Sequence, residues 1–118
     1  MENKLQIIAT TAESTTILAV GGSVDSFTAD QLTAAFGGVL SSGCTRLIAD
    51  LGGVDYTSSA GLRSLLITAK DARKLGGDLR LAAVRPHVQR VLSLSGFTSI
   101  FQIYDDVPTA LASCAARA

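Results

Sequence analysis

Short apolar runs rich in β-branched residues alternate along this chain with longer segments in which apolar residues recur every three or four positions. The short runs predict β-strands, and the longer periodic segments predict helices. Their order is β β α β α β α β α. Because helices connect the later strands, we expect an α/β fold, a mixed four- to five-stranded sheet flanked by about four helices, with one antiparallel hairpin at its start. The expected strands span residues 5–9, 16–20, 46–51, 79–84 and 100–104.

Glycine and polar residues predict where the strands end. Residues 10–15 predict the turn of the first hairpin, and Gly21-Gly22 predicts the end of the second strand. Residues 52–56 include a second glycine pair and predict a loop after the third strand.

Cap residues predict the helix starts. Thr28 and Gln31 have the spacing of a capping box at the first helix. Pro86 suits the first turn of a later helix, and Asp105 or Asp106 is expected to cap the last one. The helix between the first one and the one that starts at Pro86 carries a predicted apolar stripe, formed by Leu62, Leu65, Leu66, Ala69 and Leu75.

The length and composition of the chain favour one compact domain spanning residues 1–118. Hydrophobic residues make up 47% of the chain and charged residues 17%, which is enough apolar material for a core. Ten basic and ten acidic side chains cancel, so we expect no nucleic acid and no anionic membrane as a partner. No apolar run predicts a membrane-spanning helix or direct membrane insertion, and the first residues do not resemble a targeting peptide. Cys44 and Cys114 have no metal or redox spacing and are expected to be free thiols in a reducing cytoplasm.

Residues suited to catalysis are few. The single histidine, His87, has no nucleophile near it in sequence, and no nucleotide-binding glycine motif or cluster of metal ligands is present. Asp50, at the end of a core strand, lacks the further carboxylates of a phosphoacceptor site and is expected to bond loop amides. We therefore expect a protein that is not an enzyme and uses no cofactor. A rival active site would need Asp50, Asp55, Ser59 and His87 together.

A cluster of hydroxyl side chains, Thr57-Ser58-Ser59, leads into the second predicted helix. A serine at a helix start is suited to regulation, because phosphate adds a charge of about −2 where free amides and the helix dipole favour it. The simpler interpretation is that these hydroxyls only cap the helix.

Three segments resemble one known family. They are Gly-Ser-Val-Asp at 22–25, Val-Asp-Tyr-Thr-Ser-Ser-Ala-Gly-Leu-Arg at 54–63, and Val-Leu-Ser-Leu-Ser-Gly-Phe at 91–97, which continues through 101–105 and 110–111. In this order they are similar to the STAS family, over nearly the whole chain. The resemblance implies a mixed sheet of four or five strands with helices on its flanks.

Within that family the chain resembles the bacterial anti-sigma factor antagonists. The resemblance implies that the unphosphorylated protein binds an anti-sigma factor that is also a serine kinase, and so releases a sigma factor. The kinase would then inactivate the antagonist by phosphorylating a serine at the start of the helix after the third strand. A serine phosphatase would restore it, and nucleotide and metal would belong to these partners.

The family motif places the modified serine immediately before the glycine, and here that position holds Ala60, which cannot accept phosphate. Ser59 is then the expected acceptor and Ser58 the second candidate. A move of one residue turns the hydroxyl by roughly 100° around a helix with about 3.6 residues per turn. The resemblance places partner contacts at Asp25, Thr57, Ser58, Ser59, Ala60 and Gly61.

Asp25 also has the type and position of a cap for the first helix, and the two roles are compatible. A second hypothesis keeps the fold without phosphorylation, since STAS domains also serve as subunits of transport complexes. The altered motif at Ala60 gives that alternative weight.

Overall fold

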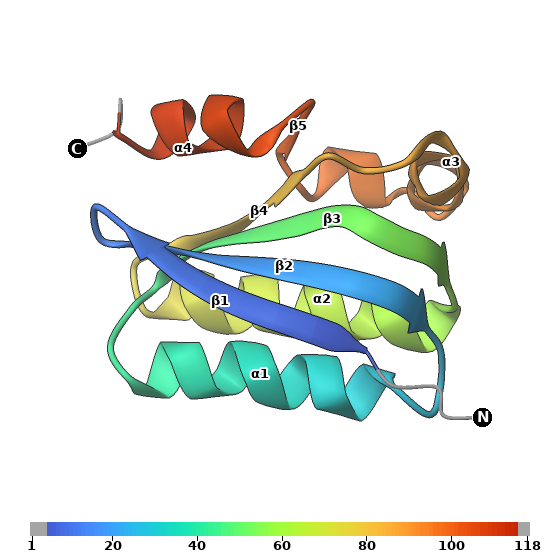
Figure 1. The fold of residues 1–118 in the computed structure, drawn as a ribbon, viewed down its shortest axis with the longest axis horizontal. Coiled ribbons are helices and arrows are strands. Elements are labelled where there is room, and N and C mark those ends of the chain that lie inside the picture. The colour runs from blue at the N-terminus through green and yellow to red at the C-terminus, as the bar shows by residue number, and fades with distance from the viewer. Residues whose placement is uncertain (1–4, 116–118) are drawn as a thin grey trace.

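The computed structural model describes residues 5–115, which form a five-stranded sheet with helices on both faces (Figure 1). Its strands, in chain order, are β1 (Gln6–Ala12), β2 (Thr15–Val24), β3 (Arg46–Thr57), β4 (Asp78–Ala82) and β5 (Ile103–Tyr104). Its helices are α1 (Ala29–Ser41), α2 (Ser59–Lys74), α3 (Pro86–Leu94) and α4 (Val107–Ala115), with a short 3-10 helix, η1 (Phe97–Ser99). The predicted α/β class and mixed sheet are confirmed.

The strands lie in the sheet in chain order. β1 pairs antiparallel with β2, and every later pair is parallel. α1 and α2 cover one face, whereas α3 and α4 lie on the other (Figure 1). Side chains of β4 alternate between the faces: Leu79 and Leu81 join the main core, and Ala82 joins a smaller cluster with Ala110 and Cys114 of α4.

The hairpin turn is tighter than predicted. β1 runs to Ala12 and β2 begins at Thr15, so only Glu13 and Ser14 connect them. Both have positive φ, 49° and 72°, as the central residues of a type I′ turn require. The right-handed twist of the paired strands favours this turn although neither residue is glycine.

Both glycine pairs lie within strands, so the predicted strand end at Gly21-Gly22 and the predicted loop at 52–56 are wrong. Gly21 pairs with Gly53, and the register of the pairing shifts on both sides of this point. A Cβ on Gly53 would lie 3.0 Å from Gly21 Cα and 3.0 Å from Val20 O. The glycines therefore let β2 and β3 approach closely and continue to Val24 and Thr57.

The predicted capping box is also wrong. α1 starts after Thr28, but the Thr28 hydroxyl donates to Ser23 O at 2.9 Å instead of capping the helix. Gln31 does not fold back either: its side chain donates to Leu5 O at 2.9 Å and accepts from Leu5 N at 3.3 Å. The Gln31 side chain therefore binds the main chain of Leu5, just before β1, instead of the main chain at the start of its own helix.

Other predicted boundaries differ near the carboxyl end. β4 stops at Ala82 instead of residue 84. β5 contains only Ile103–Tyr104, because the amides of Ile100 and Phe101 still donate to Phe97 O, at 3.0 and 3.1 Å, in the turn that follows η1. Leu75, assigned to the apolar stripe of α2, lies beyond the helix and is 58% exposed. Pro86 begins α3 as predicted, and Cys44 and Cys114 are free thiols as predicted.

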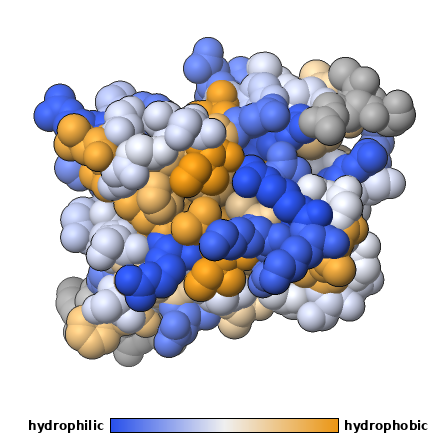
Figure 2. Space-filling view, turned by 180° about the vertical axis from the view of Figure 1, so that it is seen from behind, coloured by the Kyte–Doolittle hydropathy of each residue, from blue (hydrophilic) through white to orange (hydrophobic). Residues whose placement is uncertain are grey.

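Hydrophilic side chains divide the apolar surface on the face opposite the view of Figure 1. Figure 2 shows apolar patches near the centre of this face with hydrophilic side chains crossing them. None of the helices within residues 5–115 combines the length and the apolar character that crossing a membrane requires.

Candidate partner-binding site

The site is built where β2 and β3 end side by side. Both strands stop at this end of the sheet, and the Ser58 amide donates to Val24 O at 2.8 Å. This bond joins the end of β2 to the residue that precedes α2. The segment from Asp25 and the start of α2 therefore leave the sheet next to each other (Figure 1).

Ser58 occupies the position before α2 in an extended conformation, with φ −94° and ψ 176°. Its hydroxyl makes no cap hydrogen bond; it is buried and has no partner among the described residues. The Thr57 hydroxyl is turned to Ser58 O at 3.3 Å. The simpler interpretation of the hydroxyl cluster, that it caps the helix, is therefore wrong for these two residues.

Ser59 is the first residue of α2, and its side chain is exposed. Ala60 is half-buried and Gly61 is buried. A Cβ on Gly61 would lie 2.6 Å from Val24 Cγ1, so the first turn of α2 packs directly on β2 through this glycine. Because Ser58 makes no cap hydrogen bond and no other side chain of residues 5–115 caps α2, its first amides are free to interact with a negative group near Ser59.

Asp25 folds the segment between β2 and α1 into a tight turn. Its Oδ1 accepts from Phe27 N at 2.9 Å and from Thr28 N at 3.1 Å, while its carbonyl accepts from Ala29 N at 2.8 Å. Asp25 thus stabilises the turn that leads into α1, but its predicted role as the cap of this helix is wrong, because the amides that its carboxylate binds precede Ala29. The same turn holds Phe27 outward, with 84% of the residue exposed.

Charged and aromatic residues extend the site along the last part of β3. Tyr56 is 46% exposed, and Asp55 lies beside it with its Oδ1 3.5 Å from Arg85 Nη1. Arg85 Nε also donates to Gly52 O at 2.8 Å, which ties the start of α3 to β3. Sequence reasoning did not select Phe27 or Tyr56, although an aromatic residue next to a turn-forming aspartate was visible in the sequence.

The residues of the rival active site do not interact. Asp50 Oδ1 accepts from Gly52 N at 3.0 Å, the predicted bond to a loop amide, although Gly52 belongs to β3. Within residues 5–115, no hydrogen bond or ion pair joins Asp50, Asp55, Ser59 or His87 to one another, and no three His, Cys, Asp or Glu side chains are placed to hold a metal ion.

Comparison with known proteins identifies this arrangement of strands and helices. The family model described as STAS domain matches residues 6–110. This chain belongs to the STAS domain family. The STAS chain is 41% identical over 97 residues to a Bordetella bronchiseptica protein that carries the name anti-sigma factor antagonist BtrV, covering 82% of this chain and 84% of that protein.

Solved structures agree with the family. An anti-sigma factor antagonist from Mycobacterium paratuberculosis superposes with a TM-score of 0.87 at 26% identity, covering 96% of both chains. A sulfate transporter family protein from Wolinella succinogenes has the same fold, with a TM-score of 0.76 at 20% identity and coverage of 88% of this chain and 87% of that one. Both solved structures therefore share the fold of this chain.

Proposed function

We propose that this STAS domain is an anti-sigma factor antagonist, a protein-binding switch that sequesters an anti-sigma factor with serine kinase activity. The observation that carries the proposal is the exposed Ser59 at the uncapped start of α2, next to the Asp25 turn. Relatives named anti-sigma factor antagonists, from Bordetella bronchiseptica and Mycobacterium, support it.

The docking surface combines Asp25, Phe27, Tyr56 and Ser59 with the first turn of α2. Phe27 is the anchor, because an exposed aromatic side chain on a fixed turn buries a large area at a small cost in conformational entropy. Thr57, Ser58, Ala60 and Gly61 shape the surface from beneath. Ser58 N and Gly61 hold α2 against β2, so their contribution is to position Ser59 and not to contact the partner.

Ser59 is the phosphate acceptor in this proposal, and Ser58 is not. The Ser59 side chain is exposed, whereas the Ser58 hydroxyl is buried, so a kinase reaches the first without opening the fold. In the transfer, Ser59 Oγ bonds to the γ-phosphorus of ATP, ADP leaves, and the hydroxyl proton passes to the base of the kinase. A serine phosphatase reverses the modification by hydrolysis.

Incubation with ATP and a candidate anti-sigma kinase tests this assignment directly. Intact mass should show one added phosphate, and peptide mapping should place it on Ser59. Ser59→Ala should remove the modification, whereas Ser58→Ala and the exposed control Ser95→Ala should retain it. Phosphate on Ser58, or none in the wild type with a kinase that modifies its known substrate, would contradict the assignment.

A second candidate function is a STAS subunit of a transport complex that is never phosphorylated. Ala60 at the family's usual acceptor position favours it, and the likeness in fold to the sulfate transporter family protein from Wolinella succinogenes supports it weakly. Stable co-purification with a transporter subunit, without any phosphate gained from ATP and kinase, would support this candidate over the first.

A further inference from the structure

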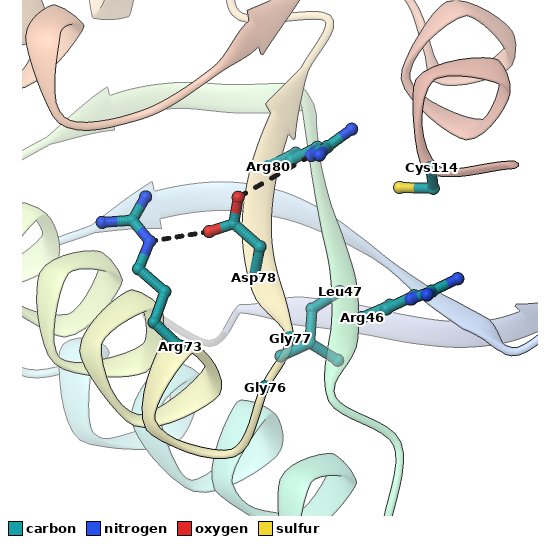
Figure 3. Close-up of a pocket in the computed structure, with 8 residues that line it drawn as sticks. All are labelled: Arg46, Leu47, Arg73, Gly76, Gly77, Asp78, Arg80 and Cys114. Carbon is teal, nitrogen blue, oxygen red and sulfur yellow. Dashed lines mark hydrogen bonds and ion pairs between the residues drawn. The ribbon is translucent and has the colours of Figure 1, made fainter. Parts of the chain in front are cut away.

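A second polar site lies at the other end of the sheet from Ser59, where β3 and β4 begin and α2 ends. A cavity of about 190 Å³ opens here between these elements and α4. Its charged lining consists of Arg46, Arg73, Asp78 and Arg80, and Cys114 of α4 forms part of the wall (Figure 3). The described lining residues thus include three arginines and one aspartate, and Arg73 and Arg80 are the two that pair with Asp78.

Arg80 is the unusual member of this group. It is 4% exposed, because alternation along β4 directs it toward α4, between the apolar side chains that fill the rest of that face. One end of its guanidinium donates to Ser113 Oγ, but Nε is buried and has no hydrogen-bond partner among the described residues. Nε forms a long ion pair with Asp78 Oδ2, at 3.8 Å, which is beyond hydrogen-bond distance.

The one carboxylate in the cavity is already engaged by Arg73. Asp78 Oδ1 accepts from Arg73 Nε at 2.8 Å and from Leu79 N at 2.9 Å. Arg73 uses a second nitrogen, Nη2, to donate to Ile100 O at 2.9 Å. Asp78 pairs with Arg73 and, at 3.8 Å, with Arg80, so its single negative charge leaves an excess of positive charge on the three arginines of the lining.

Arg46 reinforces this excess of positive charge. In the parallel pairing of β3 with β4, Arg46 is opposite Asp78 and Ile48 is opposite Arg80, so Arg46 and Arg80 are neighbours on one face. Figure 3 shows both side chains extending to the same side of the sheet, toward α4, with the Cys114 thiol pointing back at them. Arg46 makes no ion pair with a carboxylate of residues 5–115.

We propose that this cavity binds a small oxyanion of the phosphate class through Arg80 and Arg46. Burying a guanidinium with an unsatisfied nitrogen costs free energy unless an acceptor reaches it, and the planar fork of arginine matches the oxygens of phosphate. The cavity has room for one such group, being several times the roughly 30 Å³ that a water molecule occupies in the liquid. The site is independent of the proposed switch, since it lies at the opposite end of the sheet (Figure 1).

Calorimetric titration of the full chain with inorganic phosphate and with glycerol 3-phosphate, at constant ionic strength, tests the proposal. Both probes carry the tetrahedral phosphate group that the site recognises. Tighter binding of inorganic phosphate would identify the ligand as a free ion, and tighter binding of glycerol 3-phosphate would identify it as a phosphate ester. Arg46→Gln and Arg80→Gln should each weaken binding about tenfold or more, as expected for a lost charge-assisted hydrogen bond. The control Arg90→Gln, an exposed arginine on α3, should bind as the wild type does.

Arg46→Gln keeps the test decisive if Arg80→Gln does not fold, because Arg46 is only half-buried. A folded Arg46→Gln that binds both probes as tightly as the wild type would overturn the proposal, and so would a wild type that binds neither. Equal weakening by Arg90→Gln would also overturn it, since binding would then report only the overall charge. None of these outcomes depends on the result of phosphorylating Ser59.

Discussion

At the scale of single residues, Ser58 and Ser59 have opposite environments although they are adjacent and chemically identical. Ser58 is drawn inward because its amide donates to Val24 O, and its hydroxyl is left buried with no hydrogen-bond partner in the described part of the chain. Ser59 starts the helix and is exposed. The exposed Ser59 hydroxyl can therefore react with a kinase, whereas burial of the adjacent Ser58 hydroxyl costs desolvation free energy that no hydrogen bond offsets.

Ser58→Ala distinguishes this environment from ordinary capping. Loss of an N-cap serine commonly destabilises a protein by about 1 kcal/mol, whereas removal of a buried unsatisfied hydroxyl is neutral or stabilising. We expect the free energy of unfolding of Ser58→Ala in urea to equal that of the wild type or to exceed it by up to about 1 kcal/mol. A loss of about 1 kcal/mol or more would show that the hydroxyl caps α2 after all.

At the scale of elements, α4 has the one side-chain cap that sequence reasoning placed correctly. Asp106 precedes α4, and its Oδ1 accepts from the amide of Thr109, the third residue of the helix, at 2.8 Å. The hydrogen bonds from Thr109 favour the carboxylate and hold the pKa of Asp106 below its ordinary value of 3.8. The ionised cap thus stabilises α4 above that value, and the stabilisation is lost as the pH falls through the lower folded pKa.

The Thr109 amide proton reports this titration in NMR spectra. Its chemical shift should change with a midpoint below 3.8, and the protection factors of the amides along α4 should fall over the same pH interval. Asp106→Asn keeps an acceptor at the cap but cannot ionise, so it should abolish the titration. A wild-type midpoint at or above 3.8 would mean that the Asp106 carboxylate does not cap the helix in solution.

Periodicity and caps predicted the elements and their order, because local sequence determines those features. They did not predict the strand extensions through Gly21 and Gly53, since the glycines are needed where two strands distant in sequence approach closely. Gln31 was misassigned for the same reason, as its partner is the main chain of Leu5. In the site, family resemblance selected Asp25 and Ser59, whereas the exposure of Phe27 and the burial of the Ser58 hydroxyl depend on tertiary contacts.

At the scale of the whole molecule, the sheet separates the two proposed sites. The switch surface occupies the end where β2 and β3 finish, and the arginine cavity occupies the end where β3 and β4 begin (Figure 1). A charge added at Ser59 meets uncapped helix amides and does not enter the core. We therefore expect modification to act on the partner through the surface and not by refolding the domain.

Ser59→Asp tests this mode of action, because it adds negative charge at the same place. Affinity for the anti-sigma kinase should fall by more than the roughly 1 kcal/mol of a charge at an interface rim, since the partner must bury this group. The free energy of unfolding should stay within about 0.5 kcal/mol of the wild type, as for surface substitutions in general. Titration calorimetry with the kinase and urea unfolding provide the two measurements.

Ser14→Asp is the matched control. It adds the same charge in the exposed β1–β2 turn at the far end of the sheet, where aspartate tolerates the positive φ of 72°. It should leave the affinity for the kinase unchanged. If both variants lose affinity equally, total charge and not position governs binding; if Ser59→Asp binds as the wild type does, the partner does not cover the start of α2, and the proposed switch has no physical basis there.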